Sequence, residues 1–351
     1  MFMYILLLSL SVLLSYYLYP GNYPLYPESN HYCQRKRRFY NLEPQRKAEA
    51  SFKLAWGMIF KQSLLHPSKS LEVHSIEWAS FLSANDKAKY IWLGHSTLLM
   101  NLQQQCILTD PVFESSVSPL PIMMNRFQQA PVQLEEIPKI DIVLISHVHY
   151  DHMEAKSIKK LAKQAHVHFI TTLGAGYFLK KFGVDVHRIS ELDWWQSVEI
   201  NGITYTAVPA RHNAQRSVFD KNKTLWAGFV IESAQARVYF SGDTAYGKHF
   251  QDIKQQFVDF DIAFIENGQY NERWEDNHMF PSETAQAAKI LNPKRFVPIH
   301  WGAYPLSEHT WNEPVLMSIP LVKEYGISPL TPYLGQVFDI DTETTEWYKE
   351  D

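Results

Sequence analysis

Residues 146–153 read SHVHYDHM and place three histidines and an aspartate within six positions. The preceding run DIVLIS is apolar and β-branched, which predicts a buried strand that ends just before His147. Alternation along the strand would direct His147 and His149 to the same side, and the following loop would return Asp151 and His152 toward them. Imidazole and carboxylate groups together suit zinc and, less specifically, iron or manganese. The motif therefore predicts a metal site at the end of a strand.

Three further candidate ligands have the same placement, just past an apolar strand. His212 follows ITYTAVPAR, Asp243 follows RVYFSG, and His300 follows RFVPI. Taken singly, Asp243 suits a turn, and either histidine suits a surface position with ordinary hydrogen bonds. Taken together, the three residues supply the additional ligands that a site for two metal ions requires.

From about residue 88 onward, short apolar runs ended by turns alternate with stretches of helical periodicity. The predicted strands are KYIWLG, TLLMNL, CILTD, DIVLISH, VHFITTL, ITYTAVPA, TLWAGFVIE, RVYFSGD, FDIAFIE and RFVPIHWG. The predicted helices are residues 154–164, 174–182, 247–257, 282–291 and 312–325. Strands grouped in meanders with helices between them predict an α/β domain, in which two sheets pack together and helices cover them.

Composition divides the chain into four predicted segments. Residues 1–19 carry no charged side chain and predict a membrane-anchor or signal helix, and residues 20–44 predict a linker rich in proline and tyrosine. Residues 45–87 predict an N-terminal helical extension, with apolar residues at helical spacing over 45–66. Residues 88–351 then form a single α/β domain.

The first nineteen residues would span about 28 Å as a helix at ~1.5 Å per residue, close to the ~30 Å hydrocarbon core of a bilayer. They lack a basic N-terminal region and a small-residue cleavage site, so we expect an uncleaved anchor rather than a secretory signal. The basic run QRKRR at 34–38 lies downstream, and the positive-inside rule then predicts a cytoplasmic domain. Export, with this segment as the signal, is the alternative.

Charge and cysteine content exclude two further classes of protein. The net charge of −4, from 33 basic and 37 acidic residues, gives no reason to expect a nucleic-acid partner. The two cysteines, Cys33 and Cys106, are too few and too distant to form a disulfide framework. An apolar content of 46% is ordinary for a folded domain. A metal-dependent function therefore remains the most specific indication in the sequence.

The order HVHYDH, a later histidine, SGDT and then IHWG resembles the metallo-β-lactamase superfamily, from about residue 88 to the C-terminus. The resemblance implies a four-layer αββα sandwich with the metals at one edge of the sheets. It implies that one metal is held by His147, His149 and His212. It implies that the second metal is held by Asp151, His152 and His300, and that the bridging ligand is Asp243.

Longer motifs resemble the N-acylphosphatidylethanolamine-hydrolysing phospholipase D group and its bacterial relatives. These motifs are WLGHSTLLM at 92–100, LTDPVFESSVSP at 108–119, RFQQAP at 126–131, ELDWW at 191–195 and HMFPSETA at 278–285. In that group, the histidine that matches His278 lies beside the metals and assists at the substrate phosphate. The N-terminal anchor is not part of the pattern that the group shares.

The resemblance and the ligands together predict a metal-dependent phosphodiesterase of the phospholipase D type, in which a hydroxide bridging two zinc ions attacks an N-acylphosphatidylethanolamine-like phospholipid. Asp151 would orient or deprotonate the attacking water as well as bind metal, and His278 would donate toward the leaving group. His95 in LGHST and Asp110 in TDP would support the loops under the metals, Asp110 by fixing a ligand ring. We expect phospholipid and membrane as partners, exclude nucleic acid, and leave a homodimer open.

Two other functions fit parts of the sequence. The same site could hydrolyse a soluble ester-like molecule such as a lactone. A small polar pocket with arginines beside the metals would favour this alternative. A metal site that is only structural would make the chain a non-catalytic membrane protein, but an intact set of seven candidate ligands argues against that. A lipid substrate requires an apolar trough, which Trp194, Trp195 and Trp301 would line, although we expect at least one of them in the core.

Overall fold

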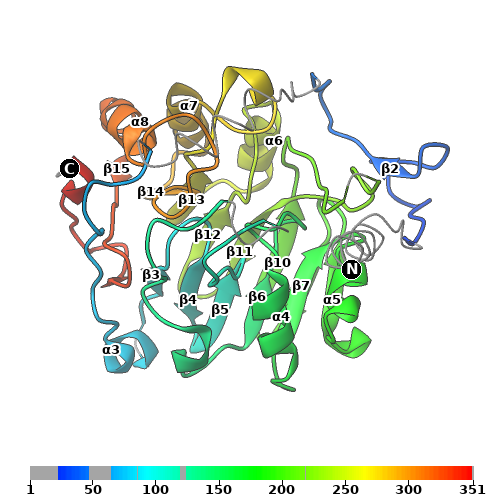
Figure 1. Ribbon diagram of the computed structural model, residues 1–351, viewed down its shortest axis with the longest axis horizontal. Coiled ribbons are helices and arrows are strands. Elements are labelled where there is room, and N and C mark those ends of the chain that lie inside the picture. The colour runs from blue at the N-terminus through cyan, green and yellow to red at the C-terminus, as the bar shows by residue number, and fades with distance from the viewer. Residues whose placement is uncertain (1–22, 47–64, 85, 119–123, 218, 350–351) are drawn as a thin grey trace, which may run out of the picture.

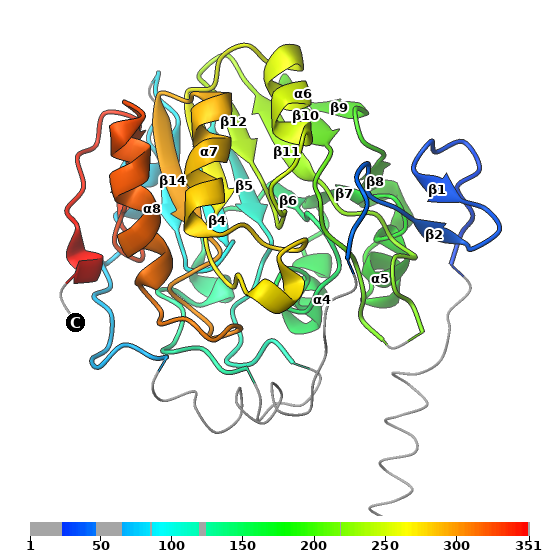
Figure 2. The same cartoon turned by 90° about the horizontal axis from the view of Figure 1, so that it is seen from above.

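The computed structural model describes residues 23–46, 65–84, 86–118, 124–217 and 219–349. Two seven-stranded sheets form the body of this part of the chain. A small ribbon of β1 (Tyr32–Cys33) and β2 (Arg38–Phe39) lies apart from them (Figure 2). Helices lie on the outer sides of both sheets (Figure 1). The expectation of two packed sheets covered by helices is therefore confirmed.

The first sheet has the strand order β16–β3–β4–β5–β6–β7–β8. Its strands are β16 (Val337–Phe338), β3 (Lys89–Trp92), β4 (Leu98–Leu102), β5 (Gln105–Thr109), β6 (Ile142–Leu144), β7 (His168–Thr172) and β8 (Ile189–Leu192). Neighbours from β16 to β5 are antiparallel, and neighbours from β5 to β8 are parallel. Parallel neighbours need crossover connections, which here include α4 (Ala155–Ala162) and α5 (Gly176–Lys181).

The second sheet has the order β15–β14–β13–β12–β11–β10–β9. Its strands are β15 (Ser328–Pro329), β14 (Arg295–Ile299), β13 (Ile262–Glu266), β12 (Arg237–Phe240), β11 (Gly228–Glu232), β10 (Ile203–Val208) and β9 (Ser197–Ile200). Neighbours from β9 to β12 are antiparallel, and neighbours from β12 to β15 are parallel. The crossovers contain α6 (His249–Gln256), α7 (Pro281–Leu291) and α8 (Glu313–Glu324).

Central strands of both sheets are buried along their whole length, as in β4, β5 and β13. A strand that is covered by helices on one face and by a second sheet on the other has no solvated side, which explains the unbroken apolar runs. The two sheets meet in aromatic contacts, for example between Tyr90 of β3 and Phe264 of β13, whose ring centroids lie 5.4 Å apart. The core therefore lies between the sheets.

The five predicted helices are present within two residues of their predicted ends. The described part of the chain also contains one 5-residue helix, α3 (Trp78–Leu82), and four short 3₁₀ segments. They are the 3₁₀ segments η2 (Leu134–Glu136), η3 (Val186–Arg188), η4 (Glu272–Trp274) and η5 (Trp347–Lys349). Helical periodicity thus located the crossovers correctly, because each of those helices has one face against a sheet or a neighbouring helix.

The predicted membrane-anchored location is not supported, and we correct it. Among the helices that the structure describes, none combines the length and the apolar content that a bilayer crossing demands. The longest, α8, has 12 residues, whereas a span needs about 20. Residues 1–19, predicted as anchor or signal, and most of the helix predicted at 45–66 lie outside the described residues. The predicted cytoplasmic location was inferred from that anchor and is therefore not supported either. The boundaries of the four predicted segments stay predictions.

Candidate metal centre

The predicted ligands meet at one edge of the two sheets. His147 and His149 follow β6, and Asp151 and His152 lie in the same loop before α4. Strands β3, β5 and β6 run in the same direction, so residues that follow them lie at one edge. The first sheet therefore brings the whole HVHYDH motif to the ends of its central strands.

The second sheet contributes the other three candidates at the same kind of position. His212 follows β10, Asp243 follows β12 and His300 follows β14. These three strands share one direction, because β12 and β14 are both parallel to β13 and two antiparallel steps separate β10 from β12. Residues separated by more than 150 positions in the sequence, His147 and His300, are thereby brought together.

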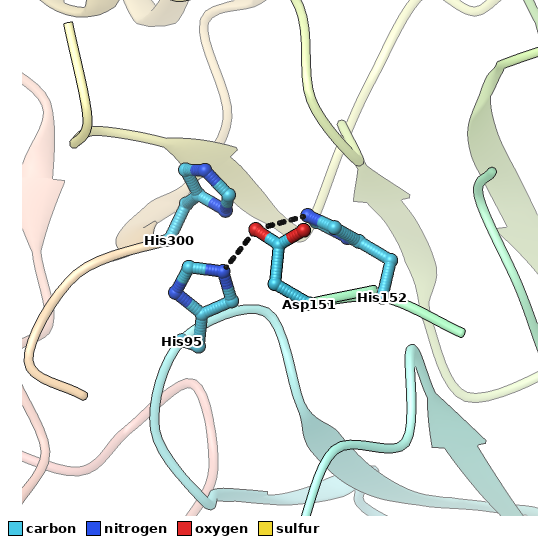
Figure 3. A group of neighbouring side chains, drawn as sticks. All are labelled: His95, Asp151, His152 and His300. Atoms are coloured by element: carbon cyan, nitrogen blue, oxygen red, sulfur yellow. Dashed lines mark hydrogen bonds and ion pairs between the residues drawn. The ribbon is translucent and has the colours of Figure 1, made fainter. Parts of the chain in front are cut away.

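Two groups of side chains offer nitrogen or oxygen atoms that lie within 4.8 Å of one another. One group consists of His147, His149, His212 and Asp243. The other group, drawn in Figure 3, consists of His95, Asp151, His152 and His300. All seven predicted ligands belong to these groups, and the structure adds His95 to them. Their role as ligands stays a prediction.

Asp243 lies between the two groups. Its Oδ2 is 3.1 Å from His152 Nε2, 3.6 Å from His212 Nε2 and 3.8 Å from His147 Nε2. Its Oδ1 is 3.0 Å from His300 Nδ1. The carboxylate thus reaches two histidines of each predicted ligand set, which is the position that a bridging ligand needs.

Most of the histidines have the protonation state that metal binding requires. Burial lowers the pKa of His147, His212 and His300 well below the ordinary value, and lowers the pKa of His149 to about 4. At pH 7 these four rings are neutral and each keeps a nitrogen lone pair, the form that binds a metal ion. Four neutral imidazoles packed around an aspartate are therefore a suitable donor set for zinc.

His152 Nε2 and Asp243 Oδ1 are buried and have no hydrogen-bond partner among the described residues, and the same is true of His95 Nδ1. Asp243 Oδ1 lies 3.0 Å from His300 Nδ1, but without the direction of a hydrogen bond. A buried polar atom without a partner costs about 1–3 kcal/mol. A cation between the two groups would satisfy His152 Nε2 and Asp243 Oδ1, so the residues present fit the metal ions that the motif predicts.

The pair formed by Asp151 and His152 is strongly polarised. Burial would raise the pKa of Asp151, but the adjacent His152 and His95 hold it well below its usual range. Burial would lower the pKa of His152, yet the carboxylates of Asp243, Asp151 and Asp110 raise it well above its usual range. In the metal-free protein, His152 therefore carries the positive charge that a bound metal would replace.

Asp110, predicted to support a ligand ring, makes three hydrogen bonds in the described structure. Its carboxylate accepts from the backbone N–H of Ser146 at 2.7 Å and from the Ser146 hydroxyl at 2.6 Å. Its Oδ2 also lies 2.6 Å from His152 Nδ1. With Nδ1 engaged, the Nε2 atom of His152 is the one available to a metal. The structure thus gives Asp110 the contacts expected of a supporting residue.

His95 lies closer to the predicted metals than expected. Its Nε2 is 3.0 Å from Asp151 Oδ2, and its ring centroid is 4.1 Å from that of His300 (Figure 3). Burial lowers the pKa of His95 to about 4, so the ring is neutral at pH 7. It therefore donates Nε2–H to Asp151 and orients that carboxylate.

Gly242 allows the ligand loops of the two sheets to approach closely. Its φ is +56°, and a Cβ atom at this position would lie 2.6 Å from the Cβ of Ser146. Any side chain would push the loop that carries Asp243 away from the loop that begins with Ser146. The glycine of the SGDT motif is thus required by the contact between the sheets.

His278, predicted to act beside the metals, does lie next to the ligands. Its ring centroid is 5.2 Å from that of His212 and 5.1 Å from that of His300. Glu266, at the end of β13, contacts it and joins it in a third group with Asp243 and His300. Sequence reasoning missed Glu266, although FDIAFIE ends in a carboxylate at the end of an apolar strand, like the other candidates.

Arg216, which the sequence analysis did not identify, holds the HVHYDH loop in place through hydrogen bonds to its backbone. Its Nη1 donates to the carbonyl oxygens of Val148 and Met153, at 2.7 Å each. Its guanidinium lies 4.1 Å from the centroid of the Tyr150 ring. No local pattern distinguishes this arginine from an exposed one, because both of its contacts come from a segment more than 60 positions away.

The three tryptophans proposed for an acyl groove lie in different environments. Trp301 is buried and stacks on Trp92, with ring centroids 5.0 Å apart, and Trp194 is buried with its Nε1 donating to the Trp226 carbonyl. Trp195 is 40% exposed. At least one tryptophan was expected in the core, and two are there.

A cavity of about 180 Å³ adjoins the HVHYDH loop. It is lined by Tyr23, Tyr150, Ala155, Lys159, Tyr177, Phe178, Lys181, Phe182, Arg216, Ser217 and Asp220. Tyr150 lies between two candidate ligands in the sequence, so the cavity and the metal loop share a wall. Five of the eleven lining residues are aromatic, three are basic and one, Asp220, is acidic.

Residues 105–301 match the family model of the beta-lactamase superfamily domain. The chain belongs to the metallo-β-lactamase superfamily. An uncharacterised protein of Mycobacterium tuberculosis is 33% identical over 290 residues, which cover 82% of this chain and 77% of that protein. N-acyl-phosphatidylethanolamine-hydrolyzing phospholipase D 1 of Caenorhabditis elegans is 33% identical over 254 residues, which cover 68% of this chain and 70% of that protein.

The fold has a solved counterpart. Igni18, a metallo hydrolase from Ignicoccus hospitalis, superposes with a TM-score of 0.57 at 20% identity, covering 73% of this chain and 99% of Igni18. The predicted family, the similarity to the phospholipase D group and the prediction of an enzyme are thus confirmed. The protein is a metal-dependent hydrolase of the metallo-β-lactamase superfamily, and its fold implies binding of divalent metal.

Proposed function

We propose that this hydrolase is a phosphodiesterase of the phospholipase D type that acts on N-acylphosphatidylethanolamine-like phospholipids with two zinc ions. The observation that carries the proposal is the position of Asp243, whose carboxylate lies within 4 Å of histidine nitrogens from both predicted ligand sets. Two metal ions that share one carboxylate suit the displacement at a phosphodiester. The similarity to the Caenorhabditis elegans phospholipase D supports the substrate class.

We propose the division of the ligands that the family resemblance implies. His147, His149 and His212 would hold one ion, Asp151, His152 and His300 would hold the other, and both would share Asp243. Bound zinc lowers the pKa of a water ligand from about 15.7 to about 7 and offsets charge on a phosphate oxygen. The chain contributes pre-oriented rings, since Asp110 and Ser146 engage the outer nitrogens of His152 and His147.

Asp151 and His278 would handle the protons. The pKa of Asp151 is held low by His152 and His95 against the effect of burial, so its carboxylate stays ionised and can accept a hydrogen bond from the attacking water. His278 has a side chain that is 13% exposed beside the rings of His212 and His300. It would donate to the oxygen that leaves phosphorus.

The aromatic cavity next to the HVHYDH loop supports a substrate with an apolar portion. Its walls include the rings of Tyr150, Phe178 and Phe182, which offer contact to an acyl chain. Its basic side chains, among them Lys159, favour an anionic substrate such as a phospholipid.

A lipid assay with matched metal analysis tests the proposal. Purified protein is incubated with N-acylphosphatidylethanolamine in mixed micelles and, separately, with a panel of lactones, each with chelator and with added zinc. We expect zinc-dependent release of phosphatidic acid, its loss with chelator and recovery with zinc, and two zinc ions per chain. Lactone hydrolysis without any release of phosphatidic acid would contradict the proposal.

A further inference from the structure

Glu266 is a buried carboxylate with a specific set of contacts. It is the last residue of β13 and is fully buried. Its Oε2 lies 2.8 Å from His278 Nδ1, and its Oε1 accepts the backbone N–H of Met279 at 2.6 Å. The backbone N–H of Thr244, next to Asp243, faces this carboxylate and favours its ionised form. Glu266 therefore joins the loop of the central aspartate to the loop of His278.

The cost of burying this carboxylate indicates a role beyond folding. Burial raises the pKa of Glu266 well above its usual range, and an isolated buried carboxylate is strongly unfavourable. Among the described residues, His278 supplies the side-chain nitrogen that contacts it, at 2.8 Å. Backbone N–H groups could be satisfied by a neutral side chain such as glutamine, but a carboxylate is suited to hold an imidazole N–H in one orientation.

The ring of His278 lies where its orientation matters. It stacks on the ring of His300 at an interplanar angle of 15° and makes an edge contact with His212. Glu266, His278, Asp243 and His300 offer polar atoms within 4.8 Å of one another. With Nδ1 held by Glu266, the second ring nitrogen, Nε2, is the one left for a reacting group.

We propose that Glu266 is a positioning residue that holds Nδ1–H of His278, so that Nε2–H meets the leaving oxygen of the phosphodiester. This inference rests on the function proposed above. In the step, the attacking oxygen forms a bond to phosphorus and the bond from phosphorus to the leaving oxygen breaks, with its electron pair remaining on that oxygen. The proton moves from His278 Nε2 to the leaving oxygen, the proton shared between Nδ1 and Glu266 stays with the pair, and the pair then regains one proton from water.

The leaving group distinguishes this role from a merely structural one. N-acylphosphatidylethanolamine releases its N-acylethanolamine as an alkoxide, which needs a proton, whereas bis(p-nitrophenyl) phosphate releases p-nitrophenolate, a stabilised anion that does not. Glu266→Gln keeps the side-chain shape but removes one of the two carboxylate acceptors. We expect kcat for the lipid to fall on the order of 100-fold with little change in KM. With the aryl substrate we expect less than roughly a threefold change, and zinc content should stay at the wild-type value.

Three matched variants complete the experiment. His278→Ala should show the same dependence on the leaving group, and adding Glu266→Gln to it should cause no further loss, because the two residues act as a unit. Glu266→Asp keeps the carboxylate but moves it away from His278 by the length of one methylene group. We therefore expect an intermediate loss of kcat, confined to the lipid substrate. Glu283→Gln is the matched control. It alters a carboxylate in the first turn of α7 that accepts the Phe280 N–H, and we expect it to behave as wild type.

The possible failures are separable. Equal losses on both substrates, loss of zinc in Glu266→Gln, or additive losses with His278→Ala would show that Glu266 is structural and overturn the inference while the proposed function stands. A wild-type protein that hydrolyses neither phosphodiester would refute the proposed function and this inference together. A loss confined to the lipid, absent in the His278→Ala background, would support both.

Discussion

The two sheets repeat one strand plan, and the site uses the two copies differently. In the first sheet, β3, β4 and β5 form an antiparallel meander and β6, β7 and β8 continue in parallel; in the second, β10, β11 and β12 are followed by β13, β14 and β15 in the same way. Asp110 follows β5 and Asp243 follows β12. The two aspartates therefore stand after matching strands at the same edge.

Their surroundings give these aspartates opposite roles. Asp110 accepts from the backbone and hydroxyl of Ser146 and contacts His152 Nδ1, so its carboxylate is saturated. Asp243 lies between histidine rings with a buried oxygen that lacks a hydrogen-bond partner, and burial raises its pKa to about 6. The comparison teaches that the end of a strand determines where an aspartate lies. The hydrogen-bond donors around it then determine whether its carboxylate holds neighbouring residues in place or stays available to a metal ion.

The largest effect should come from Asp243→Asn. Removing the shared carboxylate leaves the two ligand sets without a bridge, and we expect activity to fall by at least roughly 10³-fold, since metal catalysis contributes several kcal/mol. Metal content measured by atomic absorption should fall below two ions per chain. A variant that keeps both metals and wild-type kcat would show that Asp243 is no more than a second supporting aspartate.

A smaller effect is expected from Asp110→Asn. The amide cannot accept all three hydrogen bonds, so the His152 ring loses its fixed orientation and metal affinity should fall about 10–100-fold. Excess zinc should restore most of the activity, unlike in Asp243→Asn. Asp141→Asn is the matched control, because Asp141 accepts the Cys106 N–H away from the ligands and its loss should leave metal affinity unchanged. Irreversible loss of activity in Asp110→Asn would erase the distinction between the two aspartates.

The pH dependence of stability should single out Asp243. Its folded pKa of about 6 lies above the unfolded value of about 3.8, so the metal-free folded state binds more protons between these values. The penalty for burying the charge is therefore present above pH 6 and disappears as the pH falls toward 4. With chelator present, the free energy of unfolding of wild type, compared with Asp243→Asn, should rise by roughly 2 kcal/mol over this window. Urea titrations at pH 7 and pH 4.5 measure it, and a constant difference would contradict it.

The smallest effect should follow Ser146→Ala. The substitution removes one hydroxyl hydrogen bond to Asp110 and the contact with His147 Nδ1. The free energy of unfolding should fall by about 1 kcal/mol, and activity should change by less than roughly tenfold. Thermal denaturation and initial rates suffice as measurements. A loss as large as that of Asp110→Asn would mean that the hydroxyl, rather than the backbone N–H, carries the anchoring of that aspartate.

Local patterns predicted ten of the fourteen strands of the two sheets and the five crossover helices, and they placed the seven candidate ligands after strands; the edge strands β8, β9, β15 and β16 were missed. Each ligand lies in the loop after an apolar run such as DIVLIS or RFVPI, so its placement could be predicted without knowing the partner strand. The same rule applied to FDIAFIE would have found Glu266. No motif around Glu266 marks it as functional, unlike the HVHYDH, SGDT and IHWG motifs around the candidate ligands.

The remaining features depend on contacts that no local pattern encodes. The repeated strand plan shows no fixed sequence period, since connections of different length separate the matching strands. Arg216 is recognisable only from the Val148 and Met153 carbonyls that it binds, and His95 only from its distance to Asp151. Such contacts arise when segments distant in the sequence pack, so they follow from the tertiary structure rather than from propensity.

The division of the ligands between the sheets has a mechanical consequence. Four of the seven belong to the loop after β6 and three to the second sheet, so bound zinc would crosslink the two layers across the core that Tyr90 and Phe264 close. Such a crosslink couples the free energy of metal binding to the packing of the two sheets against each other. A substitution deep between the sheets that weakens their packing should therefore also lower the affinity for the metal.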